Sequence, residues 1–138
     1  MRDIDALKVV NDKHGHQAGD VLIKTTASIL QQSFRECDVV ARIGGDEFAI
    51  TMPSSSVEAM QKTCKRIRTA LRKRNQENPL APLSFSIGAA WGNCSKISIN
   101  EIFKNADAEM YKDKADHKEK YLSVFNTLYE SHGDKLYK

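Results

Sequence analysis

The stretch DVVARIGGDEFAITM, residues 38–52, decides the fold. Its two ends, DVVARI and EFAITM, are short runs rich in β-branched and aromatic residues, and such runs on either side of turn residues predict a β-hairpin. The adjacent glycines Gly44 and Gly45 further predict a tight bend with positive φ. The stretch therefore predicts a hairpin that carries two carboxylates, Asp46 and Glu47, at or beside its bend.

Hydrophobic spacing predicts the elements on both sides of this hairpin. We expect the end of a strand at 1–5, helices over 6–12, from about 20 to 34, over 57–73 and from 98 to about 114, a strand over 84–91, and a short amphipathic helix within 118–138. The polar stretch 13–16 interrupts the first two helices. Hairpins and single crossovers are mixed in this order, which indicates an α+β fold with a central, mostly antiparallel sheet flanked by helices.

Composition excludes several classes of protein. The chain has 138 residues, 41% apolar and 28% charged, which is typical of one globular domain and not of a disordered or fibrous chain. No apolar run approaches the ~18 residues that a membrane span needs, and the first residues have no signal-peptide core. The three cysteines have no CxxC spacing, which argues against a disulfide framework or a zinc knuckle. We therefore expect a cytoplasmic domain with reduced thiols.

Residues 62–74 contain seven basic residues and no acidic one, within a net charge of +3. The main interpretation is the solvated face of a helix. The alternative is a footprint for nucleic acid or a membrane surface. Aromatic residues are missing from this stretch, which argues against stacking on single-stranded nucleic acid. We expect no nucleic-acid partner.

Carboxylates recur at strand ends and turns. Such groups can converge on a hard cation such as Mg²⁺, which prefers oxygen ligands. The alternative is a surface turn in which Asp and Gly only make the bend. The candidate pairs are Asp3 with Asp5, Asp12 with Asp20, and Asp46 with Glu47.

The helix expected after Asp3 adds a phosphate site to this picture. Backbone N–H groups at a helix N-terminus hold phosphate, and Lys8 would reinforce them. Carboxylates that bind a metal ion next to backbone groups that bind phosphate are typical of sites for phosphoryl or nucleotidyl transfer. His14 and His16 have no third His or Cys placed to form a metal site, so loop or substrate-contact roles are preferred.

Four ordered motifs resemble the GGDEF domain of diguanylate cyclases, a family of bacterial signalling proteins. The motifs are DIDALKVVNDKHGHQAGD (3–20), RIGGDEF (42–48), SFSIGAA (84–90) and NADAEMYKDK (105–114). The similarity divides the chain into a GGDEF domain over 1–118, without the N-terminal segment that the family usually has, and a helical tail over 119–138. It also implies a sensor domain or segment upstream, outside this chain.

The resemblance implies that two GTP molecules condense to cyclic di-GMP with release of pyrophosphate in a homodimer. The 3′-hydroxyl of one GTP attacks the α-phosphorus of the other. Asp3, the carbonyl of Ile4, Asp46 and Glu47 would bind two Mg²⁺ ions per active site, with Mn²⁺ as an alternative metal. One of Asp46 and Glu47, which the sequence does not decide, would help to deprotonate the 3′-hydroxyl.

The same resemblance implies a set of substrate contacts. Asn11 and Asp20 match the pair that reads guanine, because a carboxylate accepts from the guanine N1–H and N2–H₂ donors that adenine lacks. Lys8, with a catalytic role, Lys114 and Lys118 match phosphate contacts. The remaining predicted contacts are Leu7, which replaces the usual Phe, His16 and Gly45, where the backbone approaches the substrate.

Arg35 and Asp38 form RxxD, five residues before Gly44. At this spacing the motif is similar to the family's inhibitory site, where the product cyclic di-GMP binds. An arginine fork can grip guanine or phosphate in a way that Lys cannot. The alternative is an ordinary pair in which Arg ends a helix and Asp begins a strand.

Two functions from different classes therefore remain open. The first is a Mg²⁺-dependent enzyme that makes cyclic di-GMP and is inhibited by it. The second is an inactive module that binds GTP or cyclic di-GMP, or dimerises, because the first strand that the family usually has is missing. We expect either one in the cytoplasm, separately or as the cytoplasmic part of a longer membrane-bound protein.

Overall fold

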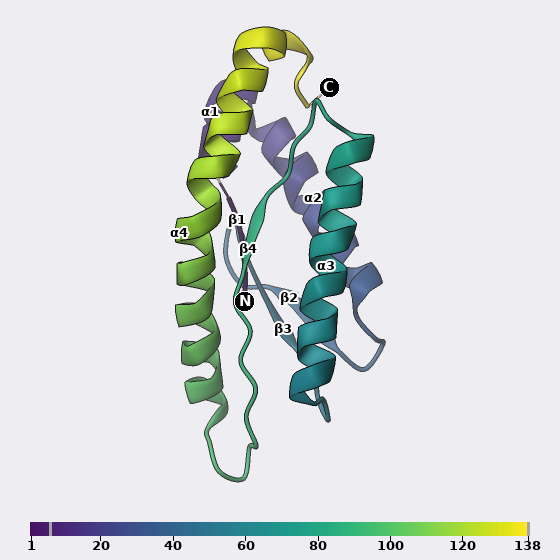
Figure 1. Ribbon diagram of the computed structural model, residues 1–138, viewed down its shortest axis with the longest axis vertical. Coiled ribbons are helices and arrows are strands. Elements are labelled where there is room, and N and C mark those ends of the chain that lie inside the picture. Colours follow the sequence, from purple (N-terminus) through teal and green to yellow (C-terminus); the bar gives the residue numbers. More distant parts are fainter. Residues whose placement is uncertain (6, 138) are drawn as a thin grey trace.

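The computed structural model describes residues 1–5 and 7–137, except for the side chains of residues 2, 3 and 134. The chain forms strands and helices in an order that confirms the α+β prediction (Figure 1). The elements are β1 (Arg2–Ile4), α1 (Leu7–His14), α2 (His16–Ser33), β2 (Val39–Arg42), β3 (Glu47–Thr51), α3 (Val57–Glu77), β4 (Phe85–Ile87), α4 (Ile99–His132) and a 3₁₀ turn (Gly133–Lys135).

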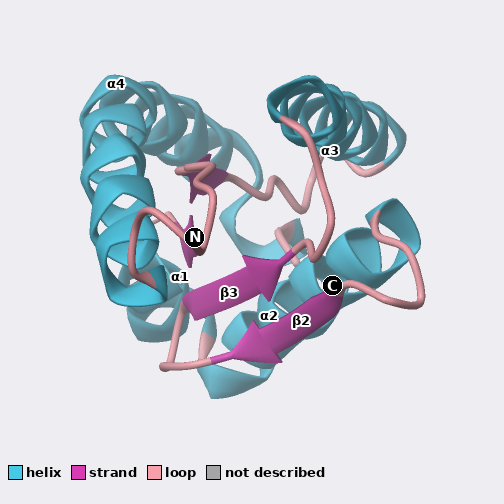
Figure 2. Cartoon of the chain, turned by 90° about the horizontal axis from the view of Figure 1, so that it is seen from below, coloured by secondary structure: helices cyan, strands magenta, loops and turns pink. Residues whose placement is uncertain are grey.

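The strands form one antiparallel sheet in the order β2-β3-β1-β4. Figure 2 shows β2 and β3 as neighbouring arrows that run in opposite directions, as the hairpin pattern predicts. The short β1 is central, because Arg2 lies opposite both Phe48 of β3 and Ile87 of β4. Its position brings the first residues of the chain directly beside the acidic hairpin.

Helices enclose this sheet through apolar side chains. α4 packs along β4, while α2 contacts α3 and also β1, and Figure 1 shows α3 and α4 on the two sides of β4. The fully buried positions come from the sheet and from every helix, so one core joins all the elements. They include Ile4, Val10, Leu22, Leu30, Ile67, Leu83, Phe85 and Phe125.

Three expected boundaries in the first part of the chain are wrong. The polar stretch 13–16 interrupts the helices only at Gly15, whose φ is +83°, so α2 begins at His16. The expected strand over 84–91 is regular only from 85 to 87. The helix expected over 57–73 extends to Glu77, after a start at which the Ser56 hydroxyl accepts from the Ala59 N–H at 3.1 Å.

The last helix differs most from expectation. α4 begins at the predicted cap, where the Ser98 hydroxyl accepts from the Glu101 N–H at 3.2 Å. It then continues without a break to His132, so an end near 114 and a separate tail helix are wrong. The physical reason is that Gly and Pro do not occur between 99 and 132, while Tyr121 and Phe125 continue the buried face.

A cavity of about 600 Å³ lies beside Met1, at the start of β1. Its lining is largely apolar and comes from the end of β3, from residues 88–94 and from both later helices. Trp91 and Ile99 border it and are half exposed. The core is thus closed at the end of β1 and open at its start.

None of the described helices is long and apolar enough to cross a membrane.

Candidate nucleotide and metal site

The acidic hairpin lies against the end of β1. The Ile4 N–H donates to the Asp46 carbonyl at 2.9 Å, and Asp3 lies opposite Glu47 in the ladder. The predicted meeting of the first residues with the diglycine bend is therefore present in the backbone. The side chain of Asp3 lies outside the described part of the structure, so its role as a metal ligand stays a prediction.

The bend itself is wider than expected. The Ile43 N–H donates to the Glu47 carbonyl at 3.0 Å, which encloses residues 44–46 between the ends of the strands. Positive φ occurs at neither Gly44 nor Gly45, so that part of the prediction is wrong. The longer loop turns the chain gradually, without the left-handed residues that a two-residue turn requires. A Cβ at Gly45 would meet nothing within 4 Å, so this side of the bend is open to a ligand.

Arg42 holds the bend in shape. Its Nε donates to the Gly44 carbonyl at 3.1 Å, and its Nη2 donates to the Gly45 carbonyl at 2.8 Å. The sequence analysis did not identify this role. An arginine two residues before a glycine pair is the signal that could have suggested it, because its fork can satisfy two carbonyls of the following turn.

Asp5 ties the opposite side of the site to β4. It is fully buried, and its two carboxylate oxygens accept from Ser84 Oγ at 2.6 Å and from Ser86 Oγ at 2.7 Å. The Asp5 N–H donates to the Ser84 carbonyl at 2.9 Å. These three bonds fix the turn that connects β1 to α1, because a buried carboxylate keeps its hydrogen-bond donors close.

α1 follows this turn and presents its N-terminus beside the hairpin strand. Leu7 points into the core, with 9% of its surface exposed, and Lys8 is exposed in the first turn. The N-terminus of α1 and an exposed cation therefore lie together, and phosphate binding by them stays a prediction. The buried Leu7 fills a core position.

The predicted guanine-reading residues gather at the corner between α1 and α2. Asn11 lies in the last turn of α1, and His16 and Asp20 are exposed in the first turns of α2. The two helices touch at Gly19, where an added Cβ would lie 1.8 Å from Asn11 Oδ1. That oxygen is buried against α2 and lacks a hydrogen-bond partner among the described residues, so recognition of a base by Asn11 stays a prediction.

Lys114 and Lys118 lie one turn apart on α4, beside β4. Asp113 anchors this part of the helix, because its Oδ2 accepts from the Ile87 N–H at 2.7 Å and its Oδ1 from Arg68 at 2.9 Å. In the sheet, β1 and β4 separate this helix from the acidic hairpin. The structure thus places these lysines at the flank of the site, and phosphate binding by them stays a prediction.

Arg35 and Asp38 pair with each other in the turn between α2 and β2. The Arg35 Nη2 and Asp38 Oδ1 atoms are 3.0 Å apart, and the Arg35 N–H donates to Asp38 Oδ2 at 2.9 Å. Burial favours a raised Asp38 pKa, but the hydrogen bonds from Arg35 outweigh it and the pKa is lowered. The Arg35 guanidinium remains 54% exposed and can still meet a ligand. This geometry agrees with the alternative that Arg35 and Asp38 form an ordinary pair between a helix end and a strand start. The inhibitory role stays a prediction.

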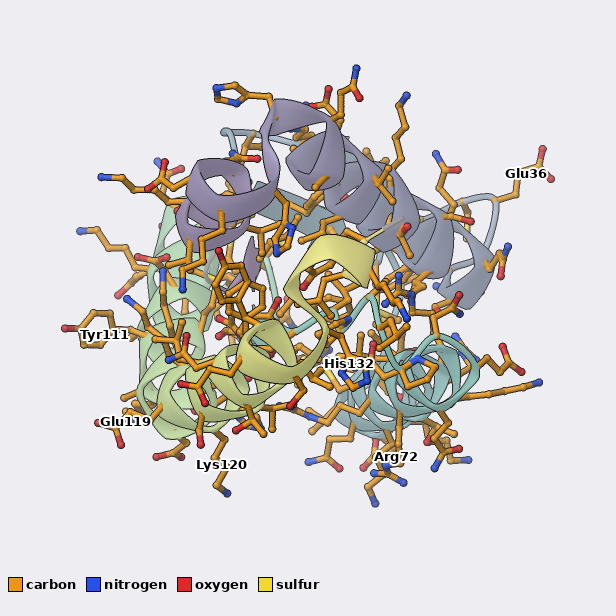
Figure 3. All side chains as sticks on the ribbon, turned by 90° about the horizontal axis from the view of Figure 1, so that it is seen from above. Glu36, Arg72, Tyr111, Glu119, Lys120 and His132 are labelled. Carbon is orange, nitrogen blue, oxygen red and sulfur yellow. The ribbon has the colours of Figure 1, made fainter. Side chains whose placement is uncertain are left out.

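The basic stretch 62–74 lies on α3, and several of its arginines have structural partners. Arg66 donates to the Ser33 carbonyl, Arg74 to the Ala81 carbonyl and Arg68 to Asp113. Arg72 points outward from α3 (Figure 3). These contacts support the main interpretation of the stretch as a helix face.

The donors at the hairpin suit a hard cation. Asp46, Glu47 and the Ile4 carbonyl are oxygen ligands on adjoining strands, which is the chemistry that Mg²⁺ prefers. The described side chains, which exclude that of Asp3, contain no cluster of three His, Cys, Asp or Glu residues able to hold a metal. Mg²⁺ binding by the hairpin together with Asp3 and the Ile4 carbonyl therefore stays a prediction.

An antiparallel sheet flanked by helices, with an acidic hairpin beside its central strand, is the palm-like arrangement of GGDEF domains. The family model described as "Diguanylate cyclase, GGDEF domain" matches residues 1–120. The chain belongs to this family.

Curated relatives agree with this assignment. The probable diguanylate cyclase DgcT of Escherichia coli K12 is 35% identical over 118 residues, which cover 83% of this chain and 26% of the relative. Diguanylate cyclase A of Treponema denticola is 30% identical over 130 residues, which cover 93% of this chain and 35% of the relative. The chain thus spans about a quarter to a third of these longer proteins.

Solved structures are similar over most of the chain. The GGDEF domain of DgcB from Caulobacter crescentus, solved in complex with c-di-GMP, superposes with a TM-score of 0.71 at 31% identity, covering 83% of this chain and 69% of that one. The active GGEEF domain of a diguanylate cyclase from Vibrio cholerae gives 0.72 at 25% identity, with coverages of 83% and 74%. Both comparisons confirm the predicted fold class.

Proposed function

We propose that this chain is a diguanylate cyclase domain that condenses two GTP molecules into cyclic di-GMP with release of two pyrophosphates. The observation that carries the proposal is the bond from the Ile4 N–H to the Asp46 carbonyl, with Asp3 opposite Glu47. This pairing puts the acidic bend beside the N-terminus of α1. Family membership supports the same reaction.

The residues divide into a phosphate side and a base side. The N-terminus of α1 and Lys8 would bind the triphosphate, while Asn11, His16 and Asp20 would bind guanine at the other end of the same helix. α1 has eight residues and is about 12 Å long, which suits the distance between a base and its phosphates. Gly45 leaves room for the approach of the nucleotide.

Asp46 and Glu47, with Asp3 and the Ile4 carbonyl, would hold Mg²⁺. When bound, the metal supplies positive charge against the triphosphate. One of the two hairpin carboxylates would accept the proton from the attacking 3′-hydroxyl. Because each protomer would present a single GTP, formation of both phosphodiester bonds requires a homodimer with two sites face to face. Lys114 and Lys118 would add phosphate contacts, and Arg35 with Asp38 would bind the product.

Asp46→Ala tests this site. We expect cyclic di-GMP formation from GTP and Mg²⁺ to fall by at least about a hundredfold, because the bend loses a carboxylate that both metal and proton need. Product is measured by liquid chromatography, and the fold is checked by the melting temperature. Glu58→Ala is the control, since Glu58 is exposed on α3. Undiminished turnover of the Asp46→Ala protein would refute the site.

The apolar cavity beside Met1 favours a second candidate, a domain that binds nucleotide without turnover. An incompletely filled core loosens the central strand on which the hairpin depends. In that case calorimetry detects GTP or cyclic di-GMP binding, while the same preparation releases no pyrophosphate.

A further inference from the structure

Aromatic rings from the last part of the chain surround the end of α1. The His14 ring lies 5.9 Å from the ring of Phe125, 5.6 Å from that of Tyr129 and 5.5 Å from that of Tyr137, measured between centroids. The neighbouring Lys13 places its Nζ 4.2 Å from the centre of the Tyr129 ring. We call His14, Phe125, Tyr129 and Tyr137 the aromatic clamp. Three of its four rings, those of Phe125, Tyr129 and Tyr137, come after residue 120, where the match to the family model ends.

The clamp is anchored to the rest of the fold. Phe125 is fully buried, and the Tyr137 N–H donates to the Leu80 carbonyl at 2.9 Å. The Tyr121 and Tyr137 hydroxyls are 2.8 Å apart, and both donate to the Pro82 carbonyl. Figure 1 shows the yellow C-terminal segment reaching the loop between α3 and β4. The clamp therefore joins the end of α1 to a fixed part of the molecule.

The same helical turn carries a predicted base-reading residue. Asn11 and His14 are three residues apart, so they are neighbours on α1. Asn11 presses against Gly19 with its buried Oδ1, which has no hydrogen-bond partner among the described residues. This turn of α1 therefore contacts α2 through Asn11 and the aromatic clamp through His14. Because an isolated helix of eight residues is marginal in water, its orientation depends on such contacts.

We propose that the aromatic clamp positions Asn11 for recognition of a purine base, and that residues after 120 thereby set nucleotide affinity and base preference. This inference rests on the proposed function, because it assigns the base of the nucleoside triphosphate to the α1–α2 corner. Tyr129 and His14 are positioning residues in this account. They act through the rotation of the last turn of α1 and touch no reacting atom.

Tyr129→Leu tests the clamp with limited risk to folding, since Tyr129 is 38% exposed. We expect the dissociation constant for GTP and the KM to rise about tenfold, as for one lost hydrogen bond, while kcat at saturating GTP stays within about twofold. The preference for GTP over ATP, measured by calorimetry, falls in parallel. Tyr129→Phe keeps the ring and restores both values.

Tyr111→Leu is the matched control. Tyr111 lies on the same helix, is 76% exposed and projects outward in Figure 3. We expect its affinity, base preference and kcat to equal those of the unsubstituted protein. A second variant, Lys13→Met, removes the cation above the Tyr129 ring and should shift the GTP affinity in the same direction by a smaller factor.

Three results would overturn the proposal. One is an unchanged GTP affinity in Tyr129→Leu. Another is a loss of kcat that follows the loss of melting temperature while base preference is kept, since this indicates a purely structural clamp. The third is an unsubstituted protein that binds no GTP, which removes the proposed site as well. A protein that binds GTP with base preference but makes no cyclic di-GMP refutes the cyclase function alone, and the affinity measurements still decide the clamp.

Discussion

The two ends of β1 differ in how completely the structure surrounds them. At the end of the strand, Ile4 and Asp5 are buried and bonded to β3 and to the segment leading into β4, and the acidic bend lies alongside. At the start, Met1 exchanges hydrogen bonds with Gly88 and then borders an apolar cavity. The geometry of the candidate site is therefore fixed locally, by ladders and buried polar contacts. At the other end the cavity leaves the packing incomplete.

Gly88, which lies beside the start of β1, and Gly45, which lies in the acidic bend, differ in the space around them. A Cβ at Gly88 would lie 1.9 Å from the Ala106 carbonyl oxygen, whereas a Cβ at Gly45 would meet nothing within 4 Å. We expect Gly88→Ala to cost about 3 kcal/mol or more, because α4 must shift away from the sheet. Gly45→Ala should leave stability within about 0.5 kcal/mol and reduce cyclic di-GMP formation. Urea unfolding and product assays compare the two, and equal stabilities would remove the contrast.

Asp5→Ala probes the closed end of β1. The substitution leaves the buried hydroxyl of Ser86 and the partly buried hydroxyl of Ser84 without their acceptor, and we expect a loss of about 2–3 kcal/mol in the free energy of unfolding. Chemical denaturation measures this loss. Asp116→Ala is the control on the exposed face of α4 and should change stability by less than about 0.5 kcal/mol. Equal effects of the two substitutions would show that the Asp5 contacts do not stabilise the turn.

A short extension probes the open end. Adding Lys-Val-Leu-Val before Met1 continues β1 toward the cavity, and we expect a gain of about 1–2 kcal/mol after the entropy of ordering is subtracted. Cys64, which lines the cavity, should then react more slowly with iodoacetamide. The control extension Lys-Ser-Gly-Ser offers no apolar side chains and should give no gain. If both extensions raised the free energy of unfolding equally, the gain would not come from apolar side chains that fill the cavity.

The smallest effect concerns Arg35, which lies away from both ends of β1. The lowered Asp38 pKa means that the pair stabilises the fold above the unfolded carboxyl pKa, near pH 4, and that this stabilisation is lost as pH falls through the folded value. We expect Arg35→Ala to lower the melting temperature slightly at pH 7 and by less at pH 3. It should also abolish inhibition by added cyclic di-GMP, while the exposed Arg72→Ala retains it. Retained inhibition in Arg35→Ala would refute the proposed inhibitory site.

Elements that depend on short-range spacing could be predicted from the residues alone. The β-branched runs on either side of Gly44 specified β2 and β3, and the repeat of apolar residues specified α2 and α3. The same local pattern located the acidic residues Asp46 and Glu47 at the hairpin. Such features follow from neighbouring residues alone, which is why they could be predicted.

Features that join distant residues became visible only in the folded chain. The three bonds of Asp5 to Ser84 and Ser86 span about eighty residues, and no local pattern indicates them. The continuous α4 arises because Phe125 finds a buried place against α1, which the sequence between 114 and 121 does not reveal. Arg42 likewise acquires its role from the width of the bend. In each case burial and hydrogen bonding with a remote partner outweigh local preference, and remote partners exist only after the chain has folded.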